Sequence, residues 1–160
     1  MKLQSTKTQA SLVFEGVEYT VKLMTERDRA RLQMENVDDA GALATAQSKA
    51  QAIEDRYAPE VEDYDPLDPE KAQLLLAKMS TEDRTEHDRH MRQIDMAQIA
   101  IRDRWLRAGL KGVSGVTIEE DGSQATVEQF LELADDRALN EAFLAITKRA
   151  ELSEEEQKNS

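Results

Sequence analysis

The amino-acid sequence predicts a mainly α-helical fold with a small β component: an N-terminal β-hairpin, long central helices and a C-terminal helical hairpin. Three observations predict it. Alternating apolar residues of the kind found in strands occur mainly in residues 1–24. From residue 25 onward, most apolar residues recur at spacings of three or four, the period of an α-helix. Residues that can cap a helix stand before several of these stretches.

The length of 160 residues is that of one ordinary domain. We therefore expect residues 1–151 to form a single domain and the polar residues 152–160 to form a flexible acidic tail. Within the domain we distinguish a hairpin, a helical segment, an acidic linker, central helices, and a Gly-rich turn with a helical hairpin. In chain order these segments are 1–24, 25–56, 57–70, 71–109 and 110–151.

The hairpin is predicted from two runs, SLVFE and VEYTVKL. Leu12 and Phe14 share one face of the first run, and Glu15-Gly16 forms a two-residue turn. The second run places four apolar residues on one face: Val17, Tyr19, Val21 and Leu23. Because an isolated hairpin is only marginally stable in water, this one must pack on a helix or pair with another chain.

The helical segment 25–56 begins with Thr25 and Asp28, which approximate a capping box. Its first apolar stripe consists of Ala30, Met34 and Val37. The following NVDDAG breaks or kinks the helix, with Asp38 or Asp39 as the new N-cap. A second stripe then comprises Leu43, Ala46, Ala50, Ile53 and Tyr57. Six alanines between residues 40 and 52 favour a helix that another helix can approach closely.

The segment 57–70 contains all three prolines and six acidic residues but no basic one, and this composition predicts a solvated linker. Asp63, Asp65 and Asp68 suggest a calcium loop at first sight. The EF-hand pattern, however, requires a glycine at the sixth position, where this chain has Asp68, and an acid at the fifth, where it has Leu67. We therefore predict no calcium site.

The central segment 71–109 predicts a short helix over AQLLLAKM and then the longest helix, capped by Ser80 and ending at Gly109. One apolar stripe of the long helix comprises His87, Met91, Ile94, Ile101, Trp105 and Ala108. A second comprises Met96, Ile99 and Leu106. A helix that is apolar on two faces should be central in the fold, with Trp105 as the largest anchor of the core.

The segment 110–151 begins with a Gly-rich stretch in which Val116 and Ile118 alternate before an Asp121-Gly122 turn, a pattern that predicts a short strand or small hairpin. Thr126 and Gln129 form a second capping box. The helix that follows has one apolar face of Val127, Phe130, Leu131 and Ala134. The last helix has another, of Leu139, Phe143, Ile146 and Ala150.

Composition excludes several classes of function. With 33 acidic and 21 basic residues, the net charge of -12 disfavours nucleic-acid and membrane partners. The absence of cysteine excludes disulfides, thiolate metal sites and cysteine nucleophiles. We expect no signal peptide and no membrane span, and therefore a soluble intracellular protein. Mimicry of a nucleic-acid backbone stays open, although the acids concentrate in the linker and near the C-terminus instead of forming regular arrays.

One constellation could be catalytic. Asp83, His87 and His90 share a helix face in DRTEHDRH, with Glu86 beside them, and two histidines with a carboxylate can hold a divalent metal. The spacing differs from HExxH, because the histidines are three residues apart and Asp88 follows the first. The helix face that carries the histidines continues into the apolar residues Met91 and Ile94. We therefore interpret the histidines as structural and predict no enzyme, no metal and no cofactor.

The C-terminal third carries a more specific pattern. Trp105 precedes GLKGVSGV, EEDGSQAT leads into a Thr-capped helix, VEQFLELADDRALNEAFLAI forms a helix pair, and the chain ends in KNS. This region resembles the tail assembly chaperones of long-tailed bacteriophages. The resemblance implies a binding protein of the host cytoplasm, which coats the helical tape-measure protein of the tail and helps recruit tail-tube subunits.

The resemblance suggests where the partner binds, since amphipathic helices with small residues can cover an apolar helical surface. The candidates are Leu43, Ala46, Ala50 and Ile53 on the Ala-rich helix, and Phe130 and Phe143 in the terminal hairpin. Burial of these residues in the protein's own core is the alternative. A virion tail or head accessory protein and an acidic inhibitor of a nucleic-acid enzyme are alternative functions. Homo-oligomerisation stays open.

Overall fold

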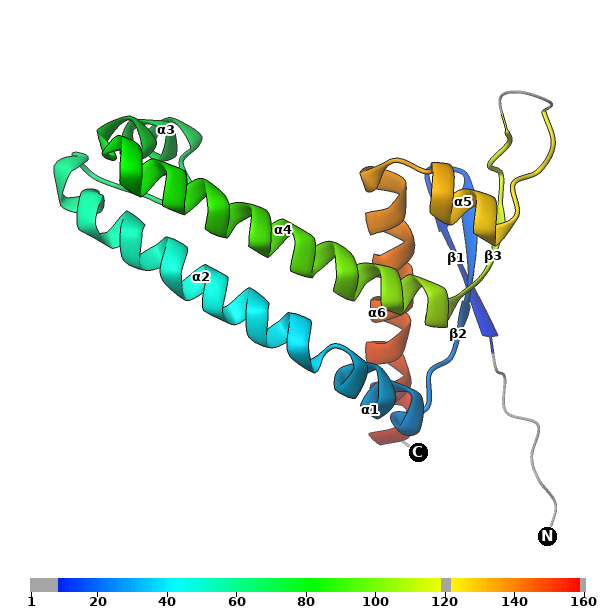
Figure 1. The fold of residues 1–160 in the computed structure, drawn as a ribbon. Helices are drawn as coiled ribbons and strands as arrows, with labels where there is room; N and C mark the ends of the chain where they lie inside the picture. The colour runs from blue at the N-terminus through cyan, green and yellow to red at the C-terminus, as the bar shows by residue number, and fades with distance from the viewer. Residues whose placement is uncertain (1–8, 119–121, 159–160) are drawn as a thin grey trace, which may run out of the picture. The chain divides into compact units, whose positions relative to one another are not determined.

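The computed structural model describes residues 9–118 and 122–158 of the chain, with side chains as far as Lys148 in the last helix. The described part is mainly helical with a small three-stranded antiparallel sheet, which confirms the predicted fold class (Figure 1). It divides into two compact units. Unit 1 consists of residues 1–35 and 102–160, and unit 2 of residues 36–101, so the chain passes from one unit to the other twice.

The sheet of unit 1 consists of β1 (Gln9–Phe14), β2 (Val17–Lys22) and β3 (Leu110–Ser114), in the order β1-β2-β3. The predicted hairpin and its turn are confirmed. Glu15 and Gly16 both have positive φ, 47° and 88°, as a two-residue hairpin turn of type I′ requires. The hairpin gains its stability by pairing with β3 and by packing against the last helix.

The helices of unit 1 are α1 (Glu26–Glu35), α5 (Val127–Leu133) and α6 (Asp136–Lys158), together with the C-terminal end of α4 (Thr81–Gly109). Both predicted capping boxes form. The Asp28 backbone N–H donates to Thr25 Oγ1 over 3.1 Å, and the Gln129 N–H donates to Thr126 Oγ1 over 3.2 Å. Helix α6 continues to Lys158, through most of the segment expected to be a flexible tail.

The core of unit 1 lies between the sheet and the helices. Its largest fully buried side chain is Tyr19, and Trp105, which we predicted as the largest anchor, is only partly buried at the margin. Trp105 packs edge-on against Phe143, with ring centroids 6.4 Å apart. The fully or nearly fully buried residues are Tyr19, Val21, Met24, Leu32, Leu106, Leu110, Phe130, Leu139, Ala142, Ala145 and Ile146.

The predicted stripe of Ala30, Met34 and Val37 is wrong, because all three are exposed and Leu32 is buried instead. The physical reason is the helix break. Helix α1 ends at Glu35 and a new helix begins, so the stripe spans two elements and faces no common neighbour. The break itself was predicted, but its N-cap residue is Asn36. Both predicted caps, Asp38 and Asp39, lie in the first turn of the new helix.

Unit 2 contains α2 (Val37–Tyr57), the short 3-10 helix η1 (Ala58–Glu60), α3 (Pro69–Lys78) and the N-terminal two thirds of α4. The segment 57–70 is only in part the solvated linker that was predicted, because most of its residues are exposed but a few are packed or cap a helix. Val61 is buried in a small apolar cluster, and Asp68 caps α3 by accepting from the Glu70 and Lys71 N–H groups. The cluster is formed by Ile53, Val61, Leu75 and Met79.

The second apolar stripe predicted on α4 is wrong for two of its three residues, Met96 and Ile99. Of the second stripe of α4, Leu106 is fully buried, but these two side chains are 71% and 45% exposed. Leu106 lies in unit 1, where the sheet and helices surround α4. Met96 and Ile99 lie in unit 2, where α4 packs against α2 along one face. Two large apolar residues are therefore left on the surface of unit 2.

The Asp28 carboxylate makes the stability of unit 1 depend on pH. A hydrogen bond from Lys22 and one from the Thr25 backbone lower its pKa from 3.8 to about 2. Because the folded pKa lies below the unfolded one, the stabilisation is present above about pH 4 and is lost as the pH falls toward 2. We expect Asp28→Asn to cost at most about 1 kcal/mol at neutral pH, since solvent screens this exposed group.

Urea unfolding of the native chain and of Asp28→Asn at a series of pH values measures this difference in the free energy of unfolding. The difference should narrow as the pH falls below about 4. A difference that stays the same from neutral to acidic pH would contradict the assignment of the effect to the carboxylate charge.

Candidate binding groove

Helices α2 and α4 form an antiparallel pair in unit 2 (Figure 1). The Tyr57 hydroxyl donates to Asp83 Oδ2 over 2.6 Å, whereas Glu54, one turn earlier on α2, lies 2.8 Å from the imidazole of His87, one turn later on α4. The α4 residues that face α2 are spaced alternately by four and three, as in a coiled-coil seam. They are Asp83, His87, His90, Ile94 and Ala97.

A second face of α4 lies beside this seam and is open. Its residues have the same alternate spacing of four and three, and all but the last stand one position before a residue of the seam that faces α2. They line two hollows on one side of α4. One hollow is lined by residues of both α2 and α4, and the other is lined by residues of α4 alone. We call the two hollows together the α2/α4 groove. The α4 residues of this open seam are Glu82, Glu86, Arg89, Gln93, Met96 and Ala100.

The first hollow, of about 510 Å³, lies between the two helices, and most of its lining residues are small. Met96 projects beside it with 71% of its surface exposed. A groove floored by small side chains lets another helix approach closely, and a flexible exposed methionine adapts to the side chains it meets. The small lining residues are Gly41, Ala42, Thr45, Ala46, Ala97 and Ala100.

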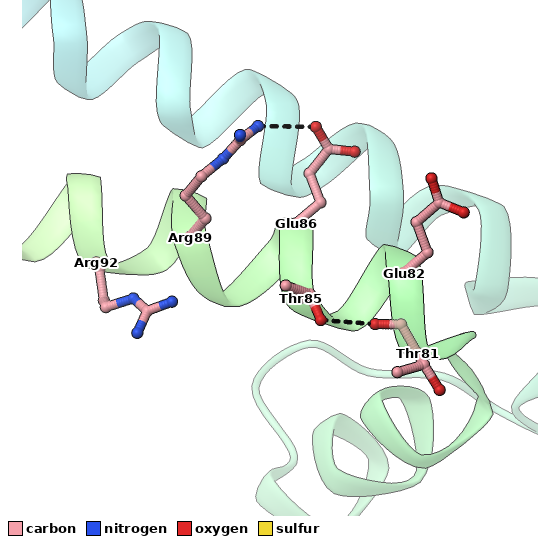
Figure 2. Close-up of a pocket in the computed structure, with 6 residues that line it drawn as sticks. All are labelled: Thr81, Glu82, Thr85, Glu86, Arg89 and Arg92. Carbon is pink, nitrogen blue, oxygen red and sulfur yellow. Dashed lines mark hydrogen bonds and ion pairs between the residues drawn. The ribbon is translucent and has the colours of Figure 1, made fainter.

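The second hollow, of about 640 Å³, lies nearer the N-terminus of α4 and is polar (Figure 2). Glu86 and Arg89 form an ion pair there, 2.9 Å between Arg89 Nη2 and Glu86 Oε1. Arg92 extends from the next turn of the helix (Figure 2). The full lining is Thr81, Glu82, Thr85, Glu86, Arg89 and Arg92.

Charge therefore changes along the α2/α4 groove. It is acidic at Glu82, basic around Arg89 and Arg92, and apolar beside Met96. Alternating charge beside an apolar patch contributes to the orientation and register of a bound helix more than to its affinity. The arrangement suits a helical ligand with one large apolar residue and charges of both signs.

The two histidines of the possible catalytic constellation lie inside the helix pair. His87 is 5% exposed and His90 3% exposed. His87 Nε2 pairs with Glu54, while Nδ1 has no hydrogen-bond partner within the described part of the chain. His90 Nδ1 lies 3.1 Å from Gln93 Oε1. Neither lines the groove, and no set of three His, Cys, Asp or Glu residues in the described ranges is placed to hold a metal.

Asp83 is the first residue of the α4 seam that faces α2, and its carboxylate accepts hydrogen bonds from several donors. The Tyr57 hydroxyl bond, and then the Arg56 charge, lower the pKa of this carboxyl below its usual range. The Ser80 backbone N–H donates in turn to the Tyr57 hydroxyl over 3.1 Å. Glu54 was not predicted as the partner of His87. Its position four residues after Ala50 was the available signal, because it places Glu54 at the edge of the buried stripe of α2.

Most of the predicted partner-binding residues are covered by the protein itself. Ala46, Ala50 and Ile53 are buried in unit 2, and Phe130 is buried in unit 1. Leu43 and Phe143 are partly buried against these clusters. Only Ala46 lines the groove, as part of its floor. The accessible lining on the same helix was missed because it is polar or small: Asp39, Gly41, Ala42, Thr45 and Lys49.

Comparison with protein-family models, with curated proteins and with solved structures produced no match. In the described ranges no helix combines the length and the apolar character needed to cross a lipid bilayer.

Proposed function

We propose that the protein is a phage tail assembly chaperone that holds a helix of the tape-measure protein in the α2/α4 groove. The observation that supports this proposal is the open second seam of α4, with exposed Met96 beside a floor of small residues. The resemblance of the C-terminal third to such chaperones provides the partner, and the groove provides a surface that fits one of its helices.

The dimensions of the groove define the length of helix that it accommodates. Its lining on α4 extends from Thr81 to Ala100. At 1.5 Å per residue this is a length of about 28 Å, so a bound helix would engage about five turns. An apolar residue of that helix would cover Met96, and the small floor residues would let its backbone come close.

The charge of unit 2 is consistent with a role in keeping an apolar partner in solution. Residues 36–101 contain 15 Asp and Glu against 7 Lys and Arg, a net charge of -8. A surface of strong single-sign net charge resists self-association. A helix buried in the groove would therefore be carried on an acidic unit that opposes aggregation of the complex.

The test is a pull-down of the tagged chain from phage-producing cells, with the bound proteins identified by mass spectrometry. The groove variant is Met96→Asp with Ala42→Glu, two substitutions at exposed positions in the lining. The control variant is Ile99→Asp with Ala44→Glu, which introduces the same two acidic side chains at exposed positions of the same helices outside the lining. We expect the groove variant to capture at least tenfold less tape-measure protein, and the control variant to capture as much as the native chain.

Four results would count against the proposal. Equal capture by both variants would show that the groove is not the binding site. Absence of a long helical protein from the native pull-down would remove the chaperone function, and persistence of the chain in purified particles would identify a virion component instead. Recovery of a nuclease or polymerase would favour the nucleic-acid mimic.

A further inference from the structure

Strand β1 is an edge strand without the usual protection. Within the described residues it hydrogen-bonds to β2 alone, in a regular register from Gln9 opposite Lys22 to Phe14 opposite Val17. Natural edge strands are normally protected by charged residues, prolines or bulges, because their free N–H and C=O groups can pair with another chain. The sequence of β1, QASLVF, has no charge and no proline, and its pairing has no bulge.

One face of β1 packs against the core of unit 1, and the other face is exposed to solvent. Ala10, Leu12 and Phe14 are half-buried and pack against the core of unit 1. Gln9, Ser11 and Val13 are on the other face, and Val13 is 67% exposed.

We propose that β1 pairs with β1 of a second copy of this chain, antiparallel about a two-fold axis, and joins the two three-stranded sheets of a homodimer. The residue sizes point to the register. With Leu12 opposite Leu12 of the second copy, Ala10 lies opposite Phe14, so each small residue faces a large one across the axis. On the other face, Ser11 lies opposite Val13.

Electrostatics favour this edge as the place where two acidic chains meet. Residues 9–14 carry no charge, although the chain as a whole has a net charge of -12. The acidic residue at the end of the strand, Glu15, is already paired with Arg137. Glu18 on β2 would be about 14 Å from its counterpart, three strand spacings away. This separation exceeds the Debye length of about 8 Å at physiological salt.

The test is sedimentation velocity of the full-length chain over a wide range of concentration. We expect a reversible dimer of the native chain, and a dissociation constant at least tenfold higher for Ser11→Lys. In the proposed register the two introduced lysines would lie diagonally across the axis, about 7–8 Å apart, and would repel each other. The control is Ser11→Thr, a neutral substitution that favours strands and should preserve the dimer.

A second measurement does not depend on the folding of the lysine variant. The chain has no cysteine, so Ser11→Cys with Val13→Cys introduces the only thiols, on exposed positions that would lie opposite each other between copies. The double variant should form a disulfide-linked dimer under mild oxidation, and neither single variant should do so efficiently. A monomeric native chain, a dimer unaffected by Ser11→Lys, or a double variant that does not cross-link would each overturn the proposal. So would a native chain that pairs only with a strand of another protein.

Discussion

Replacement of Phe130 by alanine is expected to lower the free energy of unfolding of unit 1 by about 3–5 kcal/mol. Phe130 is 2% exposed and lies edge-on to Tyr19, with ring centroids 5.9 Å apart. The lost burial of the ring and the cavity left between the sheet and α5 both contribute to this cost. The effect matters for function as well, because Phe130 was a candidate partner-binding residue. A loss of binding in this variant would report unfolding instead of a lost contact.

Unfolding in urea, followed by tryptophan fluorescence, measures this change. Trp105 is the only tryptophan and packs in unit 1 against Phe143, so its emission reports on that unit. The matched control is Leu133→Ala on the same helix, where the side chain is 69% exposed. We expect the control to change stability by no more than about 0.5 kcal/mol. An equally small effect of Phe130→Ala would show that its ring does not support the core.

Replacement of Gly115 by alanine is expected to cost about 3 kcal/mol. Gly115 follows β3 and has φ of 88°, in the left-handed region where a side chain is strained. A Cβ at this position would also lie 2.6 Å from the carbonyl oxygen of Gly16, in the turn between β1 and β2. The obstacle is backbone, so it cannot be relieved by rotating a side chain.

The two contributions can be separated with Gly122→Ala. Gly122 also has positive φ, 69°, but a Cβ there would meet nothing within 4 Å. This control carries the conformational strain without the collision, and we expect it to cost about 1 kcal/mol. The same urea titration compares the two variants. Equal losses of unfolding free energy in the two variants would show that backbone strain alone explains the cost of Gly115→Ala. The close approach to the hairpin turn would then contribute nothing to that cost.

The two proposed interfaces lie in different units. The α2/α4 groove is formed within residues 36–101, and the β1 edge belongs to the sheet of unit 1. Substitutions at one interface therefore leave the residues of the other unchanged. The groove variant should remain dimeric in sedimentation, and Ser11→Lys shows whether partner capture requires the dimer.

The local features of the fold were determined by the sequence alone. Capping boxes at Thr25 and Thr126, and the turn at Glu15-Gly16, depend on hydrogen bonds and backbone angles within four residues of one another. The same holds for Ser80, whose hydroxyl accepts from the Asp83 N–H at the start of α4. Such features can be predicted from short patterns because no distant residue contributes to them. The break between α1 and α2 was also predicted from a short pattern, although its N-cap residue, Asn36, was not.

The tertiary structure decided which periodic faces are buried. Met34, Met96 and Ile99 recur at helical spacing with other apolar residues, yet all three are exposed, because helical period defines a face without supplying a neighbour to cover it. The candidate groove could not be predicted for the same reason. Its residues are small or charged, and those of the hollow lined by both helices come together only because α4 packs against α2 along the adjacent seam. The pairing of β3 with β2 could not be predicted either, because the two strands are about 90 residues apart in the chain. Bringing such distant segments together costs chain entropy, which only the contacts of the complete fold offset.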